Sequence, residues 1–216
     1  MGSKRHRRYI VLVGDLIASR KIAERSAVQQ KLRTCLRHLN AKKREGLISP
    51  YTVTLGDEFQ AVFSAPDRIF RDALSILIAL HPVVVRFVFA VGEISTAINT
   101  KQAIGMDGPA FHEARETIEG LKKTKALFAV ATPHGNSQAL MNQSLDLVSH
   151  LMRKWPQNRL EILRDLSEHR KVRHIIRDFR VSRQAVYKSI DAGAIRTIVP
   201  LLDEIVNSLR KTLEKR

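Results

Sequence analysis

Residues 52–63 read TVTLGDEFQAVF, and this stretch decides the fold. It alternates like a β-strand up to Leu55 and becomes apolar again from Phe59, so it predicts two strands joined by a tight turn. The turn contains Gly56 and two adjacent carboxylates, Asp57 and Glu58. Acids are common in turns because of their turn propensity, so a plain polar hairpin and a metal site are both open at this point.

The segments around the hairpin predict an α+β sheet layered with helices. The predicted strands are residues 9–13, 52–55, 59–63, 83–91 and 127–131, and the predicted helices between them are residues 26–39, 67–80 and 109–123. We expect Gly14-Asp15 to end the first strand, Gly92 to end the fourth, and Ile48–Pro50 to break the chain before the hairpin. The resulting order is β-α-β-β-α-β-α-β.

The sequence after the linker-like stretch 133–137 has helical periodicity throughout. Two domains are therefore predicted, an α+β domain over residues 1–135 and an all-α domain over residues 136–216. The last predicted helix, Ile195–Lys211, has an apolar stripe that packs either on this helical module or on a second copy of the chain.

The charge of the chain favours a polyanionic partner. Lys and Arg number 37 against 21 Asp and Glu, which gives a net charge of +16 over 216 residues. Such an excess most often indicates nucleic acid binding, although a solvated basic surface is the alternative. No apolar run approaches the roughly 20 residues of a membrane helix, and the basic N-terminus lacks a secretory signal. Cys35 is alone, which excludes an internal disulfide, so a cytoplasmic protein is expected.

Two acids are candidate metal ligands. Asp15 follows the first buried strand and Asp57 lies in the hairpin turn, so both carboxylates converge if these strands are neighbours in the sheet. Carboxylate oxygens suit Mg²⁺ or Mn²⁺, which also accept water and substrate phosphates as ligands. The alternatives are that Asp15 caps the following turn and that Asp57 serves the turn itself.

The segments VLVGDLIASR (11–20) and VTLGDEFQAVF (53–63) resemble the metal-binding segments of the class III nucleotidyl cyclase and GGDEF superfamily. VRFVFAVGEI (85–94) and GMDGPAFHEARETIE (105–119) are similar to the segments that follow there. More closely, YIVLVGDLIASR with TVTLGDEFQAVF resembles the SatD family. The resemblance implies a ferredoxin-like, cyclase-like β-α-β-β-α-β domain with Asp15 and Asp57 on the metal. It also implies nucleotide binding by Gly14, Leu16, Gly56, Glu58 and Arg115, with Arg115 as the catalytic anion-binding residue.

The departures from the cyclase pattern concern catalysis. Phe111 stands where cyclases have a transition-state Asn, and Val53 stands where an adenylate cyclase has its purine-reading Lys. Leu55 replaces the second Gly of the GGDEF signature. Loss of one electrostatic donor commonly costs about 10²–10³ in rate, so a fast cyclase is not expected.

Residues 171–190 read KVRHIIRDFRVSRQAVYKSI and resemble the helix-turn-helix of bacterial DNA-binding proteins. The apolar spacing predicts a helix ending near Phe179, a turn, and a second helix capped by Ser182. Arg180 stands in the turn where glycine is usual, and a left-handed conformation there costs about 1 kcal/mol. A helical hairpin without a nucleic-acid role is the alternative.

The DNA-binding hypothesis assigns roles to individual residues. The side chains expected at base edges are Arg183, Gln184, Tyr187 and Lys188, and those expected near phosphates or the turn are Arg173, His174, Arg177, Arg180 and Ser182. The favoured hypothesis is a homodimeric regulator that binds double-stranded DNA and whose first domain binds a nucleotide and a metal. A nucleotide-converting enzyme and a protein-interaction module are the alternatives.

Overall fold

The computed structural model describes residues 7–17, 24–41, 46–54, 56–133 and 137–214. They form one five-stranded sheet with the strand order β2-β3-β1-β4-β5. The strands are β1 (Arg8–Leu16), β2 (Leu47–Val53), β3 (Glu58–Phe63), β4 (Val85–Glu93) and β5 (Phe128–Ala131). β1 pairs antiparallel with β3 and β4, β2 pairs antiparallel with β3, and β5 pairs parallel with β4. The predicted α+β class is confirmed.

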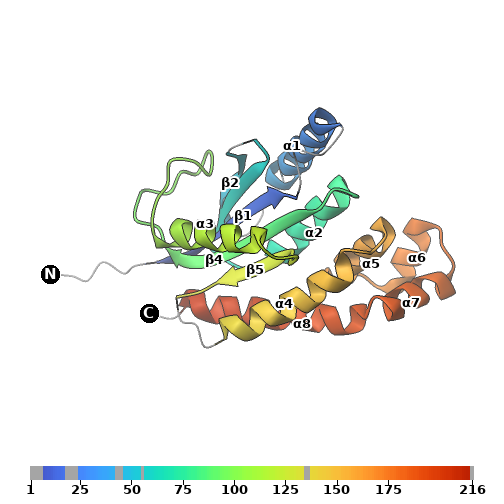
Figure 1. Cartoon of the computed structure of the whole chain (residues 1–216). Coiled ribbons are helices and arrows are strands. Elements are labelled where there is room, and N and C mark those ends of the chain that lie inside the picture. Colours follow the sequence, from blue (N-terminus) through green and yellow to red (C-terminus); the bar gives the residue numbers. More distant parts are fainter. Residues whose placement is uncertain (1–6, 18–23, 42–45, 55, 134–136, 215–216) are drawn as a thin grey trace.

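The helices cover both faces of this sheet and extend beyond it (Figure 1). They are α1 (Arg25–Ala41), α2 (Ile69–Leu80), α3 (Pro109–Lys122), α4 (Gln138–Met152), α5 (Gln157–Ser167), α6 (Val172–Phe179), α7 (Arg183–Ala192) and α8 (Ile195–Glu214). α3 packs on one face, over a small cluster that includes Val11, Val88 and Ala114. α1 and α2 pack on the opposite face, and α4 and α8 run along the sheet toward α5, α6 and α7.

The larger hydrophobic cluster joins the sheet to the helical tail. It contains Phe59 and Phe87 of the sheet together with Leu163 of α5 and Leu209 of α8. The apolar stripe of the last helix is therefore buried within the chain. The predicted domain boundary near residue 135 lies outside the described residues, and the two-domain division stays a prediction. Among the described residues, no helix has the length and apolarity needed to cross a membrane.

Two strands continue through glycines that were expected to end them. β1 runs through Gly14. The residue is glycine because the ring of Phe59 lies over that position, where an added Cβ would be 2.1 Å from the ring Cζ. β4 runs through Gly92, where an added Cβ would be 3.0 Å from Cα of Ala110 in α3. A glycine inside a strand commonly marks such a close approach. The two predicted strand ends were wrong for this reason.

The expected break at Ile48–Pro50 was also wrong, because these residues belong to β2. β2 is an edge strand, and its pairing with β3 shifts register between Leu47 and Ser49 and again between Ser49 and Thr52. A proline, which lacks an N–H group, is tolerated at a sheet edge or a bulge.

Candidate functional site

The acids of the hairpin lie beside the end of β1. In the pairing of β1 with β3, Asp15 is opposite Glu58, and Asp57 precedes Glu58 in the turn. Asp15 is buried, with 8% of its surface exposed, and the side chain of Asp57 is 17% exposed. The expectation that the first strand and the hairpin are neighbours is confirmed by this register.

Each of these carboxylates has a basic partner. Nη1 of Arg86 is 3.3 Å from Oδ2 of Asp15, and Nη2 of Arg25 is 3.4 Å from Oδ1 of Asp57. Nζ of Lys122, at the end of α3, is 3.2 Å from Oε1 of Glu58 and 2.7 Å from Oε1 of Glu119. Acids from β1, the hairpin and α3 are thus matched by cations from β4, α1 and α3.

The pKa of Asp15 depends on its burial and on the charged side chains around it. Burial raises the pKa of Asp15 above its ordinary value, and the negative charges of Glu58 and Asp57 add to this effect. The positive charges of Lys122 and Arg86 oppose it. Lys122 in turn has a raised pKa, first because it donates a hydrogen bond to Glu119 and then because of the acids around it. These side chains therefore form one electrostatic unit.

The carboxylates have the oxygen chemistry that Mg²⁺ prefers, and all of them are paired with cations of the chain. Asp15, Asp57 and Glu58 each already neutralise a side-chain cation. Within the described residues, no group of three or more His, Cys, Asp or Glu side chains is placed to hold a metal ion. Metal binding by Asp15 and Asp57 stays a prediction from the sequence.

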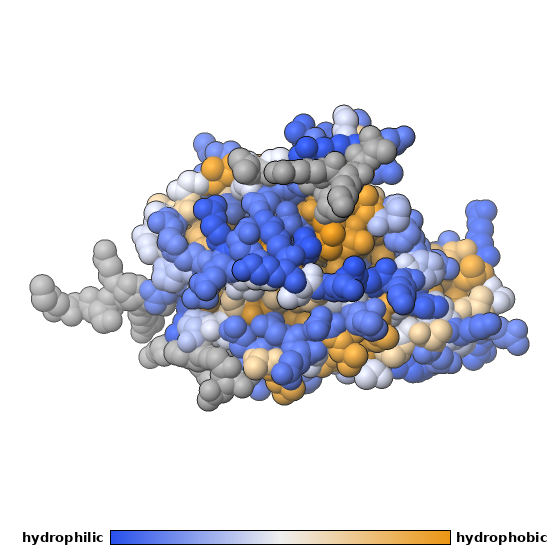
Figure 2. All heavy atoms as spheres, in the orientation of Figure 1, coloured by the Kyte–Doolittle hydropathy of each residue, from blue (hydrophilic) through white to orange (hydrophobic). Residues whose placement is uncertain are grey.

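A cleft of about 610 Å³ lies next to these acids, between the sheet, the loop before α3, and α3 itself. Its apolar wall includes Val13, Met106, Phe111 and Ile118, and its polar wall includes Glu58, Gln60, Asp107, His112, Arg115 and Glu119. Hydrophilic side chains dominate the outer surface of α3 (Figure 2). A concave site with an apolar wall and a few polar groups is the usual form of a small-molecule pocket.

The loop that closes the cleft is tied to the sheet and to α3. Gln60 donates a hydrogen bond to the carbonyl of Ala103, and the amide of Ala103 donates to Oγ1 of Thr52 at 2.8 Å. At the other end, His112 Nε2 is 3.0 Å from Oδ1 of Asp107. These contacts hold the cleft in shape.

Two of the residues predicted to bind a nucleotide line this cleft, namely Glu58 and Arg115. Arg115 is exposed and its side chain makes no hydrogen bond or ion pair with another residue that the structure describes, so its guanidinium is available to an anion. Gly14 and Leu16 are buried, Leu16 in the cluster on the opposite face of the sheet. Gly56 is exposed in the hairpin turn, where its carbonyl accepts a hydrogen bond from Gln29 at 3.4 Å.

The second candidate site is formed by α6 and α7. α6 ends at Phe179, and the next residue, Arg180, has left-handed backbone angles (φ 52°, ψ 39°). Oγ of Ser182 accepts a hydrogen bond from the amide of Ala185 at 3.1 Å. Val186 and Ile190 are buried and lie on one side of α7. The predicted cap at Ser182 is confirmed, and the left-handed turn occurs without glycine.

The other side of α7 is polar and exposed. Arg183, Gln184 and Lys188 are exposed, and two guanidinium groups lie close to the ring of Tyr187. The Cζ atom of Arg183 is 5.4 Å from the ring centroid, and that of Arg196 is 5.7 Å from it. Cations over an aromatic face hold the ring in place and concentrate positive charge there.

The comparison with protein families covers both candidate sites. The sequence model of the SatD family matches residues 9–196. The chain belongs to the SatD family. No curated protein matches the sequence. The SatD-family match extends from β1 through α7 and therefore includes the cleft as well as the exposed face of α7.

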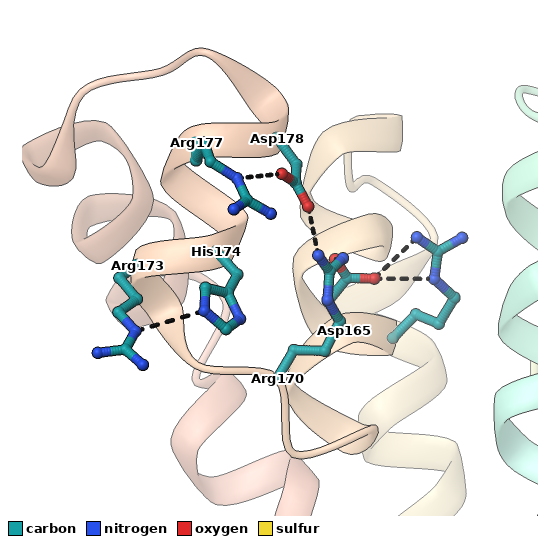
Figure 3. Close-up of polar contacts among 7 residues, drawn as sticks. Asp165, Arg170, Arg173, His174, Arg177 and Asp178 are labelled. Carbon is teal, nitrogen blue, oxygen red and sulfur yellow. Dashed lines mark hydrogen bonds and ion pairs between the residues drawn. The ribbon is translucent and has the colours of Figure 1, made fainter.

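In this SatD-family protein, an ion-pair chain fixes α6 to α5 (Figure 3). Asp165 of α5 is buried and accepts hydrogen bonds from Arg164 and Arg170. Arg170 also donates to Asp178 of α6, whose other oxygen accepts from Nε of Arg177 at 2.9 Å. Hydrogen bonds from Arg177 and then Arg170 lower the pKa of Asp178. Arg177 uses only its Nε in this ion-pair network, so its two terminal nitrogens keep their donor capacity.

Sequence reasoning missed several residues of the cleft, although a signal was present. Phe111, Arg115, Ile118 and Lys122 follow one another at intervals of three or four, which places them on one side of a helix. Starting from Arg115, this spacing identifies the wall of the cleft and the lysine beside the hairpin acids. The loop before α3 also lines the cleft, but its sequence has no periodic pattern that would have indicated this.

Proposed function

We propose that this SatD-family protein is a regulatory protein that binds double-stranded DNA through the exposed side of α7. The observation that carries the proposal is the start of α7, which is capped by Ser182 and presents Arg183 and Gln184 to solvent, with Lys188 exposed in the next turn. A helix anchored on one side and polar on the other is the element that enters the major groove in helix-turn-helix proteins.

Each side chain has a role that follows from its chemistry. Arg183 suits guanine and Gln184 suits adenine by bidentate hydrogen bonding at the start of the helix. Arg173 and Arg177 of α6 are exposed and would contact phosphates, which fixes the register of the protein on the duplex. The net charge of +16 would attract the duplex from a distance. Tyr187 would pack against the sugar or a thymine methyl while Arg196, the other arginine beside its ring, faces the backbone.

The cleft on α3 would bind a nucleotide that signals to this DNA-binding protein. Arg115 offers an unpaired guanidinium for a phosphate, and Glu58 offers carboxylate oxygens to hydroxyl or amino donors of the sugar or base. The apolar wall around Phe111 and Ile118 would take a planar base. The second candidate, a nucleotide-converting enzyme, uses the same cleft. Release of pyrophosphate from mixed nucleoside triphosphates with Mn²⁺, lost in Asp57→Ala, would favour that candidate.

A homodimer is the proposed form on DNA, because palindromic sites are read by two-fold symmetric proteins. The exposed large hydrophobic residues of α4, Leu140, Leu147 and Leu151, recur at intervals of seven and four residues. They therefore lie on one side of the helix, and pairing with a second copy would bury them. Light scattering measures the mass of the purified protein in solution. The wild type should have the mass of a dimer, and Leu147→Glu should have that of a monomer.

The DNA proposal is tested by fluorescence anisotropy with mixed-sequence duplexes over a range of salt concentrations. Arg183→Ala with Lys188→Ala should weaken binding at least about tenfold and lower the slope of log affinity against log salt by about 2. The control is Lys31→Ala with Arg33→Ala, which removes the same charge from exposed positions of α1. Equal effects of the two pairs, or no binding by the wild type at low salt, would reject α7 as the DNA-binding element.

A further inference from the structure

The ammonium group of Lys122 lies among acids from three different elements. It is ion-paired with Glu58 of β3 and with Glu119 of its own helix, at 3.2 and 2.7 Å. Its charge is also the strongest one that favours the ionised form of buried Asp15 on β1. Asp15 and Glu58 are directly opposite each other in the sheet, so two strands and a helix place their carboxylates around one cation.

We propose that Lys122 replaces a divalent cation at this end of the cleft, so that the cleft binds its ligand without Mg²⁺ or Mn²⁺. The resemblance to nucleotidyl cyclases implies a metal held by Asp15 and Asp57, whereas the structure supplies a side-chain cation to each acid. Asp15 is paired with Arg86, Asp57 with Arg25, and Glu58 with Lys122. The negative charge that would attract a metal ion is therefore neutralised by the chain itself.

Competition between the ammonium and a metal ion favours the ammonium here. Mg²⁺ demands near-octahedral oxygen coordination and gives up its water reluctantly, so it gains little from carboxylates that are already hydrogen-bonded. Lys122 is the last residue of α3, where the negative end of the helix dipole also favours a cation. The ammonium is tethered to the site and does not depend on the concentration of free metal.

Removing this charge should convert the acids into a metal site. In Lys122→Met the apolar stem remains while Asp15, Glu58 and Glu119 lose their shared cation, and the number of uncompensated ligand charges sets divalent-ion affinity. The control is Lys123→Met at the adjacent residue, which is exposed and whose side chain makes no hydrogen bond or ion pair with another described residue. The comparison needs neither DNA nor nucleotide, so its outcome is independent of the proposed function.

Mn²⁺ binding to the full chain is measured by electron paramagnetic resonance of the free ion. We expect weak binding by the wild type and by Lys123→Met, and one ion per chain bound at least about tenfold more tightly by Lys122→Met. The added Glu58→Gln change should abolish this gain. Tight binding of one Mn²⁺ by the wild type, or equal affinities of the wild type and Lys122→Met, would overturn the proposal.

Thermal melting keeps the test decisive if Lys122→Met is less stable than the wild type. Mn²⁺ should then raise the melting temperature of Lys122→Met and leave that of the wild type unchanged, because only a site in the folded state couples metal binding to stability. Lys122→Arg retains the charge and should behave like the wild type. A melting temperature of Lys122→Met that does not respond to Mn²⁺ would contradict the proposal.

Discussion

Replacing Gly14 with alanine tests how closely β1 and β3 approach each other. The added Cβ would lie 2.1 Å from Cζ and 2.5 and 2.6 Å from Cε2 and Cε1 of Phe59. This ring is fully buried and packs edge-on against Phe87, with 6.1 Å between the centroids, so it cannot move aside without displacing a second ring. Overpacking of this kind costs about 3 kcal/mol, at the upper end of its usual range. In a chain of this length the melting temperature should fall by roughly 6–12 °C.

Gly120→Ala is the matched control, because it adds the same methyl group where no heavy atom outside its own stretch of helix lies within 4 Å. Gly120 is inside α3, so the substitution should increase the free energy of unfolding by about 0.5–1 kcal/mol through helix propensity. Both variants are measured by circular dichroism melting and urea titration, and Phe59→Leu added to Gly14→Ala should recover part of the loss. If Gly14→Ala melted within about 2 °C of the wild type, the account of the β1–β3 contact would be refuted.

Three further predictions concern buried or strained residues. Asp165→Asn removes the buried anchor of the chain in Figure 3 and should lower the free energy of unfolding by about 2 kcal/mol, measured by urea titration. Arg180→Gly relieves the left-handed backbone and should raise that free energy by about 1 kcal/mol in the same assay. Burial raises the pKa of Asp15 in the folded protein, so its contribution to stability is present below the ordinary value of 3.8 and is lost as the pH rises through the raised pKa. Melting over a pH series should therefore show Asp15→Asn gaining stability relative to the wild type across that window, and a constant difference would contradict this.

The sequence predicted the elements whose periodicity is local. The strand pattern of residues 83–91 and the helix pattern of residues 67–80 correspond to β4 and α2, and the cap at Ser182 is present. The failures came from packing between elements. Gly14 and Gly92 carry no local sign that a neighbouring ring or helix fills the space beside them, so they were interpreted as strand ends. Pro50 fits a strand only because β2 is at the sheet edge, and strand order is a tertiary property.

The candidate cleft was predicted in part for a similar reason. Asp15 and Asp57 were singled out from residue type and position, and the β1–β3 register places Asp15 opposite Glu58, the residue after Asp57. Lys122 was not singled out, because a lysine at the end of a helix is ordinary in a basic sequence. Its partners are Glu58 of β3 and Glu119, one turn earlier in α3. Only the spacing from Arg115 indicated that Lys122 shares the side of α3 that faces the sheet. The contribution of the loop around Asp107 depends on long-range contacts that no local pattern encodes.

The separation of charge within the chain has a consequence for how the two candidate sites would work together. Acids concentrate beside the cleft, where Asp15, Glu58 and Glu119 share the charge of Lys122, whereas the exposed side of α7 carries Arg183 and Lys188. The acids beside the cleft are matched by cations of the chain, whereas Arg183 and Lys188 make no ion pair with another described residue, so the electrostatics would favour DNA at α7 over the cleft. The cleft would instead select a small ligand that combines one anionic group with several hydrogen-bond donors. Such a ligand would be held at its two ends by opposite charges, without competing with DNA for the same surface.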